Sequence, residues 1–327
     1  MTPEELSGLI RQGENSDVEF KRDDLRREQL AGVGSTSQLA TREQQAAPFT
    51  SGGLLHAELL PVSGSALADL DRARLTDCLG RVLMNEVPQD ELEWLDRLCG
   101  LGFMVERVGR PPVCTIAGTV LFAHRPRRLL RQAGLRWMAF SGDDMDYQSL
   151  DDRVLDAPLV GLWSLSGAGQ VFREQDGLIE IFMEQALPFL SAESAELVEH
   201  LRLERRWFYP PDAVRDALLN AFAHRDWTRP AEVEIVRYGD RMTVTSPGAL
   251  QNAMTIHKML AGQRSARNPI IVEVLRDYGY VDPRGMGVRR KIVPLVRQYT
   301  GSAPDFEAKD DFLCITLPAT QTAKDHP

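Results

Sequence analysis

Three polar residues, Asp216, Asn220 and His224, recur at intervals of four positions in one segment of the chain. Residues four apart lie on the same face of an α-helix, so the spacing predicts a polar stripe opposite an apolar one that contains Leu218 and Phe222. A carboxylate one turn before a carboxamide can orient a water molecule and supply an oxygen ligand to Mg²⁺. The same pattern is also typical of an ordinary amphipathic helix whose polar face is solvated.

A second segment that could bind a ligand is the glycine loop Gly285-Met286-Gly287, which runs into a predicted helix. The backbone N–H groups at a helix N-terminus, together with nearby arginines such as Arg289, can bind a phosphate chain. A GxG sequence before a helix is equally typical of a plain turn. The two segments form one site only if the helix around Asn220 and the turn at Gly287 face each other across a shared cavity.

The elements around these segments are the best patterned part of the chain. A helix is predicted to begin at residues 210–212, where prolines precede an aspartate. Residues 233–236 and 242–245 flank a turn and predict a β-hairpin, followed by a helix over 268–278 and a closing strand over 312–317. We therefore expect an α+β fold in which helices cover one face of a mixed, mainly antiparallel sheet.

The preceding part of the chain predicts a small α/β domain of helices and strands. Apolar residues at helical spacing between positions 69 and 101 predict two short helices. The apolar run 113–122 indicates a buried strand or a strand that continues into a helix, and residues 135–140 a second strand. A longer amphipathic helix is expected over about 176–190.

Four short motifs follow one another around the hairpin in the carboxy-terminal third. They are NAFAHRDW from Asn220, SPG from Ser246 to Gly248, ARNP with Arg267 and Asn268, and GMGVR from Gly285 to Arg289. This order resembles the GHKL-type ATP-binding module, or Bergerat fold, at the carboxy-terminus of RecG-like and Schlafen/AlbA-domain regulators. The resemblance covers about residues 209–298 and implies a Bergerat-like α/β sandwich.

The resemblance implies ATP and Mg²⁺ as ligands. Asn220 would be the Mg²⁺ ligand, Asp216 would stand where the water-activating acid is found, and the loop of Gly285 and Gly287 would cover the phosphates. The further candidates for nucleotide binding are His224, Ser246, Gly248, Arg267, Asn268 and Arg289.

Two departures from the family pattern bear on activity. Asp216 is one methylene shorter than the usual glutamate, and Ser246-Pro247-Gly248 replaces the Asp-x-Gly turn that reads the adenine amino group. We therefore expect ATP binding with weak Mg²⁺-dependent hydrolysis or none.

The resemblance also extends upstream. Residues 19–22 and 33–36 resemble the opening and closing strands of an AlbA-like domain whose middle is missing, and residues 115–122 resemble the strand that precedes the ATP module. We expect a truncated AlbA-like segment over 1–60, a middle domain over 61–190, a GHKL-like domain over 191–320 and a disordered tail over 321–327.

Composition narrows the classes of function. With 327 residues, a net charge of −9 and a pI near 5.3, the chain repels polyanions, so contact with DNA or RNA would need local basic patches. Candidate patches are residues 125–131, 202–206 and 284–291.

The cysteines are widely spaced without a CxxC pair, which argues against a zinc site or a disulfide framework. The chain shows neither a signal peptide nor an apolar stretch of roughly 18 residues, so we expect a cytoplasmic protein without a membrane partner.

Two functions remain from the sequence. One is an ATP-binding regulatory protein, specifically a transcriptional regulator of the RecG-like type, and the other is a nucleic-acid-binding module whose GHKL-like domain is structural. A homodimer is left open. The chain contains no Gly-Lys dipeptide, hence no Walker A loop, and a helicase motor is excluded.

Overall fold

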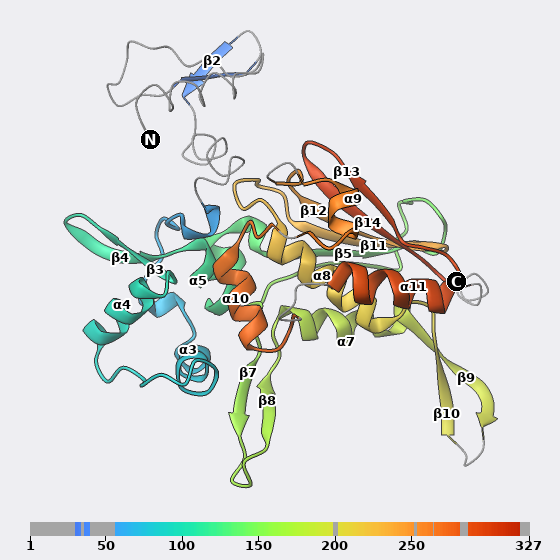
Figure 1. Ribbon diagram of the computed structural model, residues 1–327, viewed down its shortest axis with the longest axis horizontal. Coiled ribbons are helices and arrows are strands. Elements are labelled where there is room, and N and C mark those ends of the chain that lie inside the picture. Colours follow the sequence, from blue (N-terminus) through green and yellow to red (C-terminus); the bar gives the residue numbers. More distant parts are fainter. Residues whose placement is uncertain are drawn as a thin grey trace.

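The structure is a computed structural model that describes residues 30–33, 36–39, 56–198, 202–251, 254–263, 265–281 and 287–320 (Figure 1). The strand predicted over 19–22, the tail over 321–327 and the loop residue Gly285 lie outside these residues. The 30–39 region forms an antiparallel hairpin of two short strands, β1 (Leu30–Val33) and β2 (Thr36–Leu39).

A six-stranded sheet organises the molecule, with the strand order β13-β14-β12-β11-β5-β6. Strand β11 pairs in parallel with β5, and the other neighbours in this sheet are antiparallel. The strands are β5 (Leu135–Ala139), β6 (Asp151–Leu155), β11 (Val233–Arg237), β12 (Arg241–Pro247), β13 (Asp305–Ala308) and β14 (Phe312–Pro318). The prediction of a mixed, mainly antiparallel sheet is confirmed, including the hairpin of β11 and β12.

Helices α7 (Leu178–Leu190), α8 (Pro211–His224) and α11 (Val293–Thr300) lie together along one face of this sheet (Figure 1). Helix α8 begins with Pro211 at its first position and Asp212 in its first turn, where an acidic side chain complements the helix dipole. The arrangement is an α/β sandwich, as expected.

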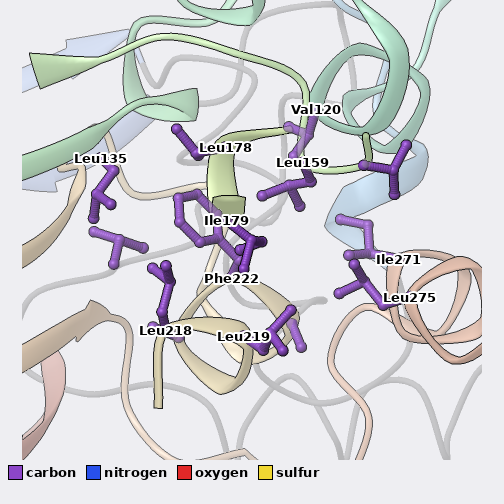
Figure 2. Close-up of a cluster of buried hydrophobic side chains, with 14 of the residues drawn as sticks. Val120, Leu135, Leu159, Leu178, Ile179, Leu218, Leu219, Phe222, Ile271 and Leu275 are labelled. Carbon is purple, nitrogen blue, oxygen red and sulfur yellow. The ribbon is translucent and has the colours of Figure 1, made fainter. Parts of the chain in front are cut away.

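The inner face of α8 fixes its orientation. Leu218, Leu219 and Phe222 are buried in one cluster with Leu135 of β5 and Ile179 of α7 (Figure 2). Burying such a side chain contributes about 1.5–3 kcal/mol, so this face is strongly held against the sheet and α7. The stripe of Asp216, Asn220 and His224 lies on another face of the helix.

The sheet crosses the boundary predicted between residues 190 and 191. Strands β5 and β6 belong to the predicted middle domain, yet they pair with β11 and share a hydrophobic core with α8. Parallel pairing of β5 with β11 joins the two parts through backbone hydrogen bonds as well as through side chains. The described parts of the two predicted domains therefore build one sheet.

The remaining middle segment contains the two short helices expected between residues 69 and 101, α3 (Arg72–Asp77) and α4 (Glu91–Gly100). Residues 113–122 follow the second of the two expectations, a strand that continues into a helix: β4 (Arg110–Cys114) is followed by helix α5 (Ile116–Phe122). The resemblance of residues 115–122 to a strand is wrong. The hydroxyl of Thr115 caps this helix by accepting a hydrogen bond from the N–H of Gly118. Every residue of α5 is buried, and a helix buried all round shows no amphipathic period.

The other elements are short helical turns and hairpins around this frame. They are η1 (Ala57–Leu59), η2 (Leu67–Asp69), η3 (Cys78–Val82), β3 (Met104–Arg107), α6 (Pro126–Leu129), η4 (Arg131–Ala133), β7 (Leu162–Leu165), β8 (Val171–Gln175), β9 (Ser191–Val198), β10 (Arg202–Trp207), α9 (Ile256–Leu260), α10 (Pro269–Asp277) and η5 (Gly287–Ile292). Helix α10 lies within the predicted range 268–278. Within the described ranges, every helix is too short or too polar to cross a membrane.

Candidate functional site

A cavity of about 350 Å³ lies over the polar face of α8. Its walls come from α8, β12, β14, α9, α10 and η5, so it is built from both the sheet and the surrounding helices. Small-molecule sites commonly have volumes of roughly 300–1,000 Å³. The predicted site residues that line it are Asp216, Asn220, His224, Ser246, Gly248, Arg267, Gly287 and Arg289.

One end of the cavity brings Asp216 and Asn220 against the turn at Gly287. A Cβ atom built on Gly287 would lie 3.6 Å from Nδ2 of Asn220 and 3.7 Å from Oδ2 of Asp216. The Asn220 Nδ2 atom donates a 2.7 Å hydrogen bond to the backbone oxygen of Asp216. This bond fixes the amide, because it uses one of its donors on the helix itself. Asn220 and Gly287 therefore line one cavity, as expected, but they lie in near contact at its end and not across it.

The carboxylate of Asp216 is buried and paired. Its Oδ2 lies 3.4 Å from Nζ of Lys291, and its Oδ1 lies 4.0 Å from Nη1 of Arg215. Burial raises the pKa of Asp216, while Lys291 and then Arg215 act in the opposite direction. Lys291 is the nearest cationic group to this carboxylate among the described residues.

The other end of the cavity holds His224, two helical turns beyond Asp216. At ~1.5 Å per residue, the Cα atoms of these residues are separated by about 12 Å along the helix. The exposed surface of His224 lines the cavity. Surrounding protein and then the Arg267 guanidinium lower the pKa of this imidazole, which favours its neutral form at pH 7.

Arg267 and Gly248 form a close contact beside His224. Arg267 is buried, and its Nη2 donates a 2.6 Å hydrogen bond to the backbone oxygen of Ala249. Gly248 has φ +110°, and a Cβ atom there would collide with Nη1 of Arg267 and lie 2.5 Å from Cβ of Asp226. Only glycine fits this turn, because a side chain meets both an unfavourable backbone conformation and a packed guanidinium.

The wall between the two ends is largely apolar. It consists of Leu219, Val244, Met254, Met259, Val272, Val281, Leu313 and Ile315. Ser246 also lines the cavity, and its hydroxyl donates to the backbone oxygen of Ala221. An apolar wall between polar ends suits a ligand with a flat or apolar body and charged substituents.

Two candidates from the sequence are not found in the cavity lining. Asn268 is fully buried, and its Nδ2 donates to the backbone oxygens of Ala223 and Arg225, so it holds α10 against the end of α8. Gly285 lies outside the described residues.

His224 and Arg225 are adjacent in the NAFAHRDW motif but have different places in the structure. His224 lines the cavity, whereas Arg225 is fully buried and donates to the backbone oxygens of Gln132, Arg229 and Ala231. Burial lowers the pKa of Arg225 to about 9. Its role in the structure is to fasten the end of α8 to the segment before β5.

The sequence motifs did not identify two charged residues, Glu58 and Lys291, although Lys291 belongs to the candidate basic patch 284–291. Lys291 contacts Asp216, and Glu58 accepts hydrogen bonds of 2.9 Å from the N–H groups of both Ile270 and Ile271 at the start of α10. Neither residue falls within the motifs, and their partners are distant in sequence. The position of Lys291 shortly after the glycine loop is the local sequence feature that could have identified it.

Asn220 and Asp216 are the residues at this end of the cavity that carry possible oxygen ligands for Mg²⁺. Within the described ranges, clusters of three or more His, Cys, Asp or Glu side chains that could hold a metal are absent. Mg²⁺ nevertheless often binds through one or two protein oxygens, several waters and substrate phosphates. The hydrogen bond from Nδ2 leaves Oδ1 of Asn220 as an oxygen ligand, so the residues fit a Mg²⁺ ion carried by a phosphate chain.

A family model matches part of the chain. Residues 231–317 match the family model described as "Putative ATP-dependent DNA helicase recG C-terminal". The predicted resemblance to the RecG-like ATPase-type module is confirmed for this segment, which suggests nucleotide binding. The match runs from β11 into β14 and does not include α8. The AlbA-like resemblance of the first residues stays a prediction.

The chain is also similar to a solved structure, the DIP2311 protein from Corynebacterium diphtheriae. The TM-score is 0.54 with 21% sequence identity, over 91% of this chain and 55% of that chain. At this identity the likeness shows the fold. The chain spans about half the length of that protein. No curated protein matches the chain.

Proposed function

We propose that the chain binds ATP with Mg²⁺ in the cavity over α8 and hydrolyses it slowly or not at all. The observation that carries this proposal is the juxtaposition of Asn220 and Asp216 with the Gly287 turn at one end of a cavity with an apolar wall. The apolar wall would take the base, and the Gly287 end the phosphates. The family match over residues 231–317 supports the same ligand class.

The residues have separate roles in this proposal. Asn220 would hold Mg²⁺ through Oδ1, and Arg289 would attract the phosphate chain from the rim. When bound, Mg²⁺ would neutralise phosphate charge and orient the chain. His224 and Arg267 would close the opposite end of the cavity.

Slow turnover follows from the state of Asp216. A general base must be free to accept a proton from water, whereas Asp216 is engaged by Lys291 at 3.4 Å. Its short side chain also limits its reach. We expect phosphate release well below the rate of roughly 1 per second found for typical enzymes.

The test of binding is a thermal shift. ATP analogues with Mg²⁺ should raise the melting temperature of the full chain by mass action, and Asn220→Ala should abolish the shift. Asn85→Ala is the matched control, because Asn85 is exposed and lies outside the cavity lining. An equal shift in wild type and Asn220→Ala would remove Asn220 from the site.

A regulatory role is supported by the contacts of the cavity with the segment that begins at His56. The Nδ1 atom of His56 lies 3.2 Å from the backbone oxygen of Arg267, and Glu58 binds the first turn of α10. A ligand that shifts Arg267 would therefore act on the start of this segment. Transcriptional regulation in the cytoplasm is the specific form that we propose. Hydrogen exchange at residues 57–60 with and without ATP would test the coupling, which an unchanged exchange rate would contradict.

Nucleic-acid binding is the second candidate, with a GHKL-like domain that is then structural. It is favoured by Arg125, Arg128 and Arg131, which are exposed along one short segment. Binding to DNA or RNA that weakens steeply with salt, and is lost when these three arginines are replaced by glutamine, would support it. Salt-independent or absent binding would remove this candidate. Gel filtration would determine whether the chain forms a homodimer.

A further inference from the structure

Lys291 lies next to the cavity, where it contacts the lining residue Asp216, and it follows Gly287 by about one turn of helix. It belongs to η5, the helix that begins at Gly287 and ends at Ile292. Its Nζ lies 3.4 Å from Oδ2 of Asp216, and its side chain is 40% exposed. The ammonium group is thus anchored on one side and open to solvent on the other.

A phosphate group bound beside Gly287 and Asn220 would come close to the carboxylate of Asp216. The Cβ position on Gly287 is already only 3.7 Å from Oδ2 of Asp216. Two anions at this separation repel each other, and the repulsion grows as water is excluded. A cation beside Asp216 reduces this repulsion in addition to the Mg²⁺ ion proposed at Asn220, and Lys291 is in that place.

The cations that line the cavity, Arg267, Arg276 and Arg289, each have a partner within the protein. Arg289 donates from Nη1 to the backbone oxygen of Ala261, and Arg276 is paired with Glu273 and Asp277. Arg267 lies at the opposite end, beside Gly248. An ammonium group has three donors, so Lys291 can keep its pair with Asp216 and still donate to a ligand oxygen.

We propose that Lys291 binds the terminal phosphate of the nucleotide directly and makes the site selective for triphosphates over diphosphates. The inference rests on the proposed nucleotide site and adds to it a residue that the motifs do not contain. Lys291 bridges Asp216 and the terminal phosphate, so its contribution is largest for the longest phosphate chain. A diphosphate, held at the Gly287 turn, ends short of the ammonium group.

The experiment is calorimetric titration of ATP, ADP and AMP with Mg²⁺ into the full chain. Lys291→Met should weaken ATP binding by roughly tenfold or more, the usual scale for a lost charge-assisted hydrogen bond. ADP and AMP should bind almost as they do to wild type, so the preference for ATP over ADP collapses. Lys291→Arg should retain most of the preference. Arg297→Met, which removes an exposed cation on α11 outside the cavity lining, is the control and should change nothing.

A double variant separates direct binding from simple neutralisation of Asp216. If Lys291 touches the phosphate, Asp216→Asn with Lys291→Met still lacks the preference for ATP, although no unpaired carboxylate remains. Recovery of the preference in this double variant would overturn the proposal, as would an equal loss of ATP and ADP binding in Lys291→Met. The double variant also serves if the single one folds poorly, because it buries no unpaired charge.

The two proposals fail in different ways. If wild type binds no nucleotide at all, the nucleotide site itself is wrong and this inference goes with it. If wild type binds ATP and Lys291→Met binds it equally well, only the role of Lys291 is wrong.

Discussion

Gly287 faces Asn220 at the end of the cavity, so that a Cβ atom on residue 287 would lie 3.6 Å from Nδ2 of Asn220. That separation is ordinary van der Waals contact, and the backbone at Gly287 is not among the positive-φ glycines. The position can therefore carry a small side chain without strain. A larger one would occupy the space above Asn220.

This geometry predicts graded effects of substitution at residue 287. Gly287→Ala should fold and bind nucleotide with a modest loss, whereas Gly287→Val should fold and lose binding, because its methyl groups enter the phosphate end. Calorimetric titration of ATP and thermal denaturation of each variant check this. Full binding by Gly287→Val would show that the phosphate lies elsewhere.

At Gly248 we expect substitution to reduce the stability of the fold, whereas substitution at Gly287 should affect ligand binding. Gly248→Ala should destabilise the fold by about 1–3 kcal/mol, because its Cβ meets the Arg267 guanidinium and Asp226 and its φ is +110°. Urea denaturation measures the change. Gly167→Ala is the control, since nothing lies within 4 Å of its Cβ position, and it should unfold as wild type does.

The hydrogen bonds of Arg225 predict that a lysine at this position, although also positively charged, would not preserve the stability of the fold. Its Nη1 and Nη2 atoms serve the backbone oxygens of Gln132, Arg229 and Ala231. Arg225→Lys should therefore lower the free energy of unfolding by about 3 kcal/mol or more. An ammonium group cannot reach all three backbone oxygens as the planar guanidinium does, so buried carbonyl groups lose their hydrogen bonds. Arg128→Lys, at an exposed position, should cost almost nothing in the same urea titration.

Glu58 predicts a pH dependence of stability with a definite sign. Burial raises the pKa of Glu58 above its ordinary value, although hydrogen bonds from Ile270 and Ile271 act against this rise. The folded state thus binds the proton more tightly than the unfolded state, and the linked stabilisation is complete below the ordinary pKa and is lost as the pH rises through the raised value.

Comparison with Glu58→Gln tests this effect, because the substitution removes the titrating carboxyl group and keeps a side chain of nearly the same shape. The free energy of unfolding of wild type, minus that of Glu58→Gln, should fall as the pH rises from about 4 to 7. Urea titrations across this range give the difference directly. A difference that rises with pH would mean that the two hydrogen bonds outweigh burial.

The sequence predicted what depends on local periodicity and on motif order. The four-residue spacing of Asp216, Asn220 and His224 placed them correctly on one helix face, and the hairpin of β11 and β12 followed from alternation around a turn. The contact of α8 with the Gly287 turn was expected only because the motif order resembled a known module, since no local pattern specifies which surfaces meet.

The failures have equally physical reasons. The run 115–122 is apolar and rich in small and β-branched residues, a composition that a fully buried helix and a buried strand share. The pairs Asp216–Lys291 and Glu58–Ile271 join residues far apart in the sequence, so only the packed chain reveals them. Asn268 was assigned to the nucleotide because of its motif, whereas its amide spans the ends of α8 and α10.

The parallel pairing of β5 with β11 has a practical consequence for anyone who wishes to shorten the chain. A fragment cut at residue 191 would keep the whole cavity lining but expose the β11 edge, with its row of free N–H and C=O groups. Such an open edge recruits strands from other molecules and promotes aggregation. Insolubility of that fragment would therefore be a fault of the cut and would carry no information about the ligand.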